Sequence, residues 1–187
     1  MRRIVFLLED RSMKHFLEAF IPRFFPGLIF LCIPHDGKTD LEASIPRKLK
    51  GWNVPGDRFI VIRDNDGSNC KKLKAKLVDL CVGGGRPDTL VRIACQELEA
   101  WYLGDLDSLK NIYGLTVNVN QNKQPYRNPD GIGSPTAEVE RLADGFQKTD
   151  GARCLGAVLN PRKNQSISFK MLVAGIEKVS GQTAVIV

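Results

Sequence analysis

The sequence is poor in the residues that bind soft metals or form disulfide frameworks. It has two histidines and five cysteines among 187 residues, and no two cysteines form a Cys-x-x-Cys pair. Zinc sites usually need several closely spaced ligands of these types, so neither a zinc site nor a histidine-based metal site is expected. The odd, scattered cysteines also argue against a disulfide framework. Neither histidine is a credible partner for Ser134, which disfavours a Ser-His-Asp hydrolase.

Long apolar runs and phosphate-binding glycine loops are also missing. No apolar stretch approaches the ~20 residues that cross a bilayer. The apolar start is short, and Glu9 and Asp10 follow it where a signal peptide would have a small-residue cleavage site. The glycines at 83–85 lack the Lys-Ser/Thr ending of a P-loop, and no Gly-x-Gly-x-x-Gly occurs. We therefore expect a soluble, cytoplasmic protein with no membrane partner.

The composition is that of an ordinary globular domain with a basic balance. Hydrophobic residues make up 43% and charged residues 26%, which is close to the average. The net charge of +6 is uneven, because residues 151–187 carry five basic side chains and one acid. A second basic cluster consists of Lys71, Lys72, Lys74 and Lys76. This balance permits binding to phosphate-rich partners, although a lysine cluster can also be a solvated helix face.

Strand and helix patterns alternate through the first two thirds of the chain. Apolar runs predict strands at residues 3–8, 28–33, 58–63 and 89–95. Apolar residues at three- and four-residue steps predict helices after the first three strands. The expected helix starts are Ser12, a capping box of Thr39 with Glu42, and Ser68 or Asn69. Repeated strand–helix–strand units predict an α/β fold, with a mostly parallel sheet flanked by helices on both faces.

The last third has a weaker pattern. Residues 117–133 are rich in Asn, Gln, Pro and Gly, which indicates a long loop. Ser134 and Pro135 predict the start of a helix, and residues 167–179 predict a closing helix. We expect residues 1–113 to form the α/β core and residues 114–187 to form a loop and a C-terminal helical extension that packs on the same domain.

Acidic residues follow the predicted strands directly. The first, third and fourth strands lead into Glu9 and Asp10, Asp64 and Asp66, and Glu97 and Glu99. In a parallel sheet these carboxylates gather at one edge, where like charges are costly unless a cation neutralises them. Oxygen ligands favour Mg²⁺ or Mn²⁺. Any single acid can instead cap a helix or form a turn, and Glu97 suits a helix-dipole partner. Together, Glu9, Asp64 and Asp66 predict a metal site.

Two groups of residues resemble known proteins. A strand ending in Glu9 and a later strand ending in Asp64-x-Asp66 resemble the Toprim fold of topoisomerases, primases and OLD-type nucleases. The stretch Gln-Glu-Leu-Glu-Ala-Trp at 96–101 is more specific. It is similar to a bacterial, Toprim-like family of unknown function that is often encoded beside an ATPase, and the Ser-Ile-Ser-Phe at 166–169 matches that family's closing segment. The resemblance covers residues 4 to about 176, but Asp10 stands where Toprim proteins usually have glycine, and Gly67 comes two positions early.

The resemblance implies a Mg²⁺- or Mn²⁺-dependent nuclease acting on DNA or RNA. Its metal ligands would be Glu9, Asp64 and Asp66, which polarise the scissile phosphate and activate water through the metal. Glu97 or Glu99 would hold a second metal or act as general base. The expected contacts to the phosphate backbone are Arg11, Lys38, Arg63 and Lys170.

Two other functions remain open from the sequence. The same fold can serve as a non-catalytic module that binds nucleic acid or an ATPase partner, for example in a phage-defence or repair complex. A weaker alternative is a small-molecule phosphatase or nucleotide-binding protein. The oligomeric state is not predicted.

Overall fold

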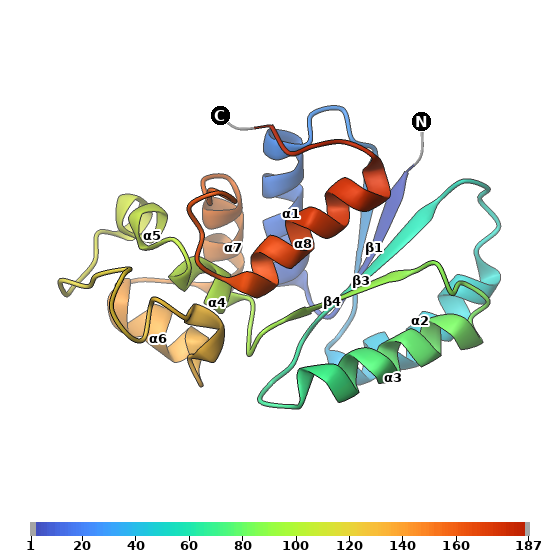
Figure 1. Cartoon of the computed structure of the whole chain (residues 1–187), viewed down its shortest axis with the longest axis horizontal. Helices are drawn as coiled ribbons and strands as arrows, with labels where there is room; N and C mark the ends of the chain where they lie inside the picture. The colour runs from blue at the N-terminus through green and yellow to red at the C-terminus, as the bar shows by residue number, and fades with distance from the viewer. Residues whose placement is uncertain (1–2, 186–187) are drawn as a thin grey trace.

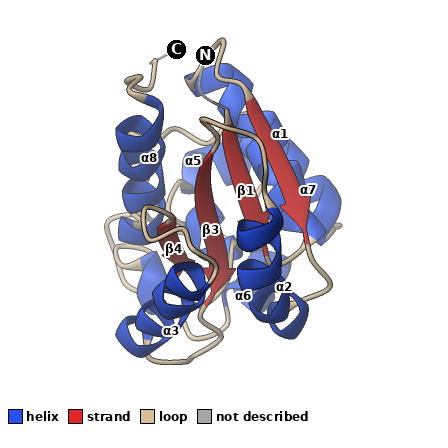
Figure 2. Cartoon of the chain, turned by 90° about the vertical axis from the view of Figure 1, so that its right-hand side faces the viewer, coloured by secondary structure: helices blue, strands red, loops and turns tan. Residues whose placement is uncertain are grey.

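The structure, a computed structural model, describes residues 3–185 and contains one parallel sheet in that range. The four strands have the spatial order β2-β1-β3-β4 and all run in the same direction, as Figure 2 shows. Their bounds are β1 Ile4–Leu8, β2 Phe30–Pro34, β3 Arg58–Asp64 and β4 Leu90–Ala94. Every residue of β1 is buried, because helices cover both faces of this central strand.

Two helices cover each face of the sheet. Helices α2 (Lys38–Gly51) and α3 (Cys70–Gly83) pack on one face, in front of the strands in Figure 2. Helices α1 (Arg11–Phe24) and α8 (Ile167–Ser180) pack on the other. Successive residues of β1 alternate between the two hydrophobic clusters that result, as the two-residue period of a strand requires. The predicted α/β fold with flanking helices is therefore confirmed.

The remaining helices form a group at one end of the molecule (Figure 1). They are α4 (Glu99–Leu103), α5 (Leu106–Tyr113), the 3₁₀ helix η1 (Pro129–Gly131), α6 (Pro135–Leu142) and α7 (Lys148–Gly156). Trp101 of α4 is fully buried, with ring-centroid distances of 5.3 Å to Phe16 and 5.4 Å to Phe169. Its indole nitrogen donates a hydrogen bond to Ser168 Oγ at 2.9 Å. These contacts join the helical group, α1 and α8 into one hydrophobic core.

Two of the predicted helix starts are wrong. Asp10, and not Ser12, caps α1, because the Asp10 carboxylate accepts a hydrogen bond from Met13 N at 2.9 Å. Helix α2 begins after Gly37, whose φ of 90° suits glycine and which has no side chain to cap the helix. The predicted capping box of Thr39 with Glu42 does not form, because other elements recruit the Glu42 carboxylate.

The predicted starts of α3 and α6 are confirmed. Asn69 caps α3 by accepting hydrogen bonds from the backbone nitrogens of Lys71 and Lys72 at 3.1 and 3.0 Å. Pro135 is the first residue of α6, and the five cysteines are free. Within residues 3–185 no helix is long and apolar enough to cross a membrane. Helices α5 and α7 were not predicted, and α7 contains Gly151 and Gly156, which interrupt an apolar stripe.

Candidate metal and phosphate site

The candidate site lies at the carboxyl ends of β1 and β3. The chain passes from β1 to β2 on one side of β1 and then crosses to β3 on its other side. The strand order therefore reverses between β1 and β3. Ligands of open α/β sheets bind at such points. Glu9 directly follows β1, and Asp64 is the last residue of β3. The backbone nitrogen of Asp64 donates a hydrogen bond to Glu9 Oε2 at 3.1 Å, so the fold brings these two predicted residues together.

Asp64 holds a carboxylate oxygen that no group within residues 3–185 satisfies. Among the described residues, its Oδ1 is buried and has no hydrogen-bond partner. Burial raises the pKa of Asp64 well above its usual value, and the nearby charges of Glu9, Glu99 and Asp10 raise this pKa further. An ionised carboxylate in this position is costly without a cation beside it. The structure therefore concentrates negative charge at the end of β3.

Glu9 has a similar but better compensated environment. Burial raises the pKa of Glu9, and the charge of Asp66 adds to this shift. The hydrogen bond from the Asp64 backbone and the charge of Arg63 oppose it. Arg63 Nε lies 3.6 Å from Glu9 Oε2. In this arrangement Glu9 faces an arginine and a backbone N–H.

Asp66 lies on a tight loop after β3 and points to a lysine. Its φ is 45° and that of Gly67 is 74°, so glycine directly after Asp66 fits a left-handed turn. Gln96 holds this loop: its backbone oxygen accepts from Asp66 N at 3.1 Å, and its Oε1 accepts from Gly67 N at 3.0 Å. Asp66 Oδ2 lies 3.1 Å from Lys38 Nζ. The early glycine is thus part of a loop that the segment after β4 supports.

Glu97 and Glu99 have different environments. Glu97 Oε2 accepts a hydrogen bond from Thr136 N at 2.8 Å, so Glu97 stabilises the first turn of α6. Glu99 is only 2% exposed, and burial raises its pKa, although Lys148 at 3.9 Å opposes the shift. The two glutamates therefore cannot be treated as equivalent candidates.

Tyr102 belongs to the site region, although sequence reasoning did not single it out. Its hydroxyl is buried without a hydrogen-bond partner among residues 3–185. Burial raises the pKa of Tyr102 well above its usual value, and the charges of Glu99 and Asp10 raise this pKa further. From the sequence, a tyrosine next to Trp101 is interpreted as a residue of the hydrophobic core. Only its hydroxyl without a partner marks it as a candidate site residue.

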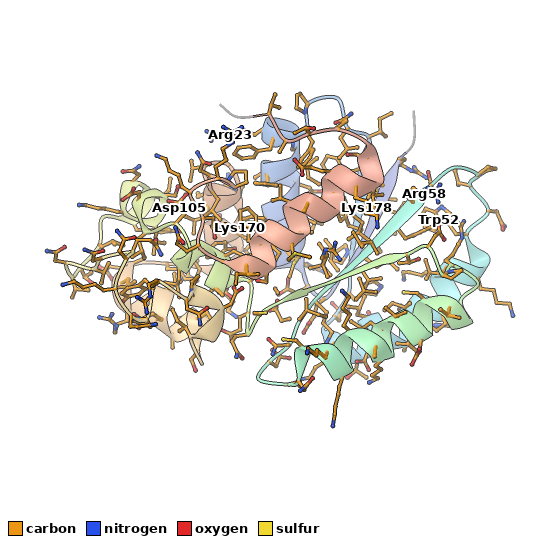
Figure 3. The ribbon with its side chains drawn as sticks, viewed as in Figure 1. Arg23, Trp52, Arg58, Asp105, Lys170 and Lys178 are labelled. Atoms are coloured by element: carbon orange, nitrogen blue, oxygen red, sulfur yellow. The ribbon has the colours of Figure 1, made fainter. Side chains whose placement is uncertain are left out.

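The four predicted phosphate contacts lie in unlike surroundings. Arg11 is exposed at the first residue of α1, and Lys170 is exposed on α8 (Figure 3). Lys38 is exposed but paired with Asp66. Arg63 is buried, with its guanidinium bound to Glu42 and near Glu9. Arg63 therefore organises carboxylates, whereas the other three present their charge to solvent.

The predicted metal ligands form no ready ligand set. Within residues 3–185 no three His, Cys, Asp or Glu side chains are arranged to hold a metal ion. Glu9 faces the Asp64 N–H and Arg63, and Asp66 faces Lys38. The chemistry of the residues nevertheless fits a hard cation, because the donors are all carboxylate oxygens and Asp64 Oδ1 is unsatisfied. Binding would require the Asp66 side chain to leave Lys38.

Comparisons with known proteins agree with this architecture. A family model described as "Domain of unknown function (DUF4276)" matches residues 8–177. The C-terminal region of the Xanthomonas campestris pv. campestris OLD protein superposes with a TM-score of 0.54 and 14% identity, covering 96% of each chain. The C-terminal region of the Burkholderia pseudomallei OLD protein gives 0.47 and 16%, covering 83% of this chain and 86% of that one. No curated protein matches the chain. The first likeness shows that this chain shares the α/β fold of that OLD region.

Proposed function

The chain belongs to the DUF4276 family of domains of unknown function, and we propose that it is a Toprim-like nuclease that depends on Mg²⁺ or Mn²⁺. The observation that carries this proposal is the half-buried Asp64 side chain beside Glu9 at the switch point of the sheet, because its buried Oδ1 has no hydrogen-bond partner within residues 3–185. Such perturbed acids in the ligand-binding position of an α/β fold are typical of functional sites.

A divalent cation is the partner that these carboxylates best fit. Burial and the charges of neighbouring acids raise the pKa values of Glu9 and Asp64, and a cation would remove that cost. Glu9, Asp64 and Asp66 are the residues that would hold it. When bound, the metal would supply Lewis-acid polarisation of a phosphate and activation of water.

A phosphodiester is the substrate class that the surroundings favour. The chain carries a net charge of +6, and Lys38 lies directly beside Asp66. The Toprim resemblance includes OLD-type nucleases, and the fold is that of the C-terminal region of an OLD protein. Exposed lysines and arginines bind nucleic-acid phosphates without reading sequence, so Arg11, Lys38 and Lys170 suit DNA or RNA equally.

The side chains would divide the chemical work as follows. Glu99 is buried with a raised pKa, which suits a general base that takes a proton from the attacking water. Glu97 is committed to the first turn of α6, so we assign it a positioning role. Lys38 would move from Asp66 to a phosphate oxygen, and Arg63 would keep Glu9 oriented.

Calorimetric titration of Mg²⁺ and Mn²⁺, followed by cleavage assays on labelled DNA and RNA, tests the proposal. Wild type is compared with Asp64→Asn and with Asp88→Asn. Asp88 is a matched control because it is an exposed acid that pairs with Arg58 at the opposite end of the strands, as the position of Arg58 in Figure 3 indicates. We expect metal binding and cleavage in wild type and Asp88→Asn and neither in Asp64→Asn. Cleavage by Asp64→Asn at the wild-type rate would refute the assignment.

A second candidate function is a non-catalytic module that binds nucleic acid or an ATPase partner. The arrangement of Asp66 on Lys38, with no ready ligand set among residues 3–185, favours it. Such a module would bind an oligonucleotide equally well with a chelator present and would not cleave it. An ATPase partner and a role in phage defence or repair rest on the family resemblance, and co-purification with an ATPase encoded alongside would support them.

A further inference from the structure

A basic groove lies between α2 and α3 at the same end of the sheet as the candidate metal site. Its cavity has a volume of about 570 Å³, within the usual range of ligand pockets. Four cationic side chains and one carboxylate line it: Lys38, Arg63, Lys72, Lys76 and Glu42. We call this feature the α2–α3 groove.

The α2–α3 groove is continuous with the site at the strand ends. Lys38 lines the groove and places its Nζ 3.1 Å from Asp66 Oδ2. Arg63 also lines it, and its Nε lies 3.6 Å from Glu9 Oε2. A ligand in the groove would therefore lie directly beside two of the predicted metal ligands.

The charges in the groove are only partly compensated. Glu42 binds both Arg63 and Lys76, with Lys76 Nζ at 2.6 Å from Glu42 Oε2. Among the described residues, no carboxylate lies within ion-pair distance of Lys72. Glu42 is the one carboxylate that lines the groove, and Glu9 and Asp66 at its edge pair with Arg63 and Lys38. Three carboxylates thus face four cations, and the groove retains a net positive charge that attracts anions.

Two further features point to an anion. The side chain of Arg63 is only 7% exposed, and its Nε–H, which lies 3.6 Å from Glu9 Oε2, has no hydrogen-bond partner within residues 3–185. The groove also meets the first turns of two 14-residue helices, and α2 has no side-chain cap on its first backbone N–H groups. Helix N-termini with free N–H groups bind phosphate through hydrogen bonds and the helix dipole.

We propose that the α2–α3 groove binds the phosphate groups of a nucleic-acid strand that flank the phosphate at the metal site. The location of the scissile phosphate rests on the proposed function, whereas the groove itself rests on its own charges. Lys72 and Lys76 are one helical turn apart, about 6 Å along the axis of α3. This separation suits successive charges of an extended strand better than one small phosphate.

The matched test uses two double variants on the same helix. Lys72→Gln/Lys76→Gln removes two charges from the groove, and Glu42 keeps Arg63 as its partner. Lys71→Gln/Lys74→Gln removes the same charge from the opposite side of α3, where both residues line a cavity beside β4. Fluorescence anisotropy with labelled DNA and RNA oligonucleotides measures the affinity over about 50 to 200 mM salt. A metal chelator is present throughout so that the oligonucleotides are not hydrolysed.

We expect the groove variant to bind more weakly and with a shallower salt dependence. Loss of two phosphate contacts lowers the log–log slope by about 1.4 to 1.8. Over that fourfold salt range, wild type then loses about 7- to 12-fold more affinity than the groove variant. The Lys71→Gln/Lys74→Gln slope should stay within a few tenths of wild type.

Three results would overturn the groove proposal. They are equal salt slopes in the two double variants, no oligonucleotide binding by wild type at the lowest salt, or an affinity for inorganic phosphate equal to the affinity per phosphate of the oligonucleotide. The last result would make it a small-anion site. Because these measurements are made in chelator, they are independent of the cleavage assay. If the groove binds oligonucleotides but the protein never cleaves them, the groove proposal stands and only the proposed nuclease activity is refuted.

Discussion

Replacing Asp64 by asparagine should stabilise the protein while removing its metal response. The wild-type side chain is half-buried, its buried Oδ1 has no hydrogen-bond partner among the described residues, and Glu9 and Glu99 lie near it, so its ionised form is costly. Asparagine keeps the shape and removes the charge, and its amide can donate to a neighbouring carboxylate. Functional residues often carry such a cost in stability, and single stabilising substitutions commonly add about 0.5–2 kcal/mol to the free energy of unfolding.

The expected size follows from the length of the chain. For a protein of this size, 1 kcal/mol corresponds to about 2–4 °C in Tm, so Asp64→Asn should melt about 1–8 °C higher near neutral pH without metal. Bound metal should reverse this difference in stability between Asp64→Asn and wild type. At a free concentration 100 times its Kd, Mg²⁺ or Mn²⁺ would stabilise wild type by about 2.7 kcal/mol and the variant not at all.

The pH dependence has a definite sign. The pKa of Asp64 is raised in the folded protein, so the folded state binds its proton more tightly than the unfolded state, where the pKa is about 3.9. The favourable contribution of this group is complete below the unfolded pKa and is lost as the pH rises through the folded pKa. The advantage of Asp64→Asn should therefore be small near pH ~4 and grow toward neutral pH.

The assay is thermal unfolding by calorimetry or circular dichroism across pH, with and without metal. Asp57→Asn provides a control of opposite sign, because the hydrogen bond from Arg3 lowers the pKa of Asp57. Its stabilising contribution is present above the unfolded pKa and is lost as the pH falls through the folded one. Asp57→Asn should therefore melt lower than wild type at neutral pH. An Asp64→Asn protein that melts lower at neutral pH, or whose advantage is independent of pH, would refute the charge argument.

Three further predictions concern packing, capping and metal competition. Gly156→Ala should cost about 1–3 kcal/mol in urea unfolding, because its Cβ would lie 2.5 Å from Phe16 O, whereas Gly83→Ala meets nothing within 4 Å and should be near neutral. Ser166→Ala should cost about 1–2 kcal/mol in the same assay, since its hydroxyl caps α8; a neutral result would contradict that role. Lys38→Met should raise metal affinity about 1.4- to 5-fold by calorimetry, because its ammonium is paired with a predicted ligand; weaker binding would count against the competition.

Local patterns in the sequence were sufficient to predict the sheet and the proximity of Glu9 and Asp64. Buried strands appear as continuous apolar runs, and helix stripes recur every three or four residues, so the α/β fold follows from short-range periodicity. Glu9 and Asp64 each follow such a run directly. The parallel pairing of β1 with β3 then brings them together, as expected from the rule for strand ends.

Helix starts and weakly patterned helices were harder to predict. Aspartate and serine are both good N-cap residues, and in the folded chain it is Asp10 that occupies the N-cap position of α1. Helix α7 has glycines at 151 and 156, which lower its helix propensity. Its position depends on close packing against α1, which no local pattern reports.

The roles of the remaining charged residues were decided by tertiary structure alone. Glu97 stabilises a helix that begins nearly forty residues later, and Arg63 is buried between Glu9 and Glu42. Lys38 is paired with Asp66 across 28 residues. Sequence reasoning could place these side chains at one edge of the sheet, because strand direction is a property of the backbone. It could not assign their partners, because an ion pair depends on atoms that lie within 4 Å only after the chain has folded.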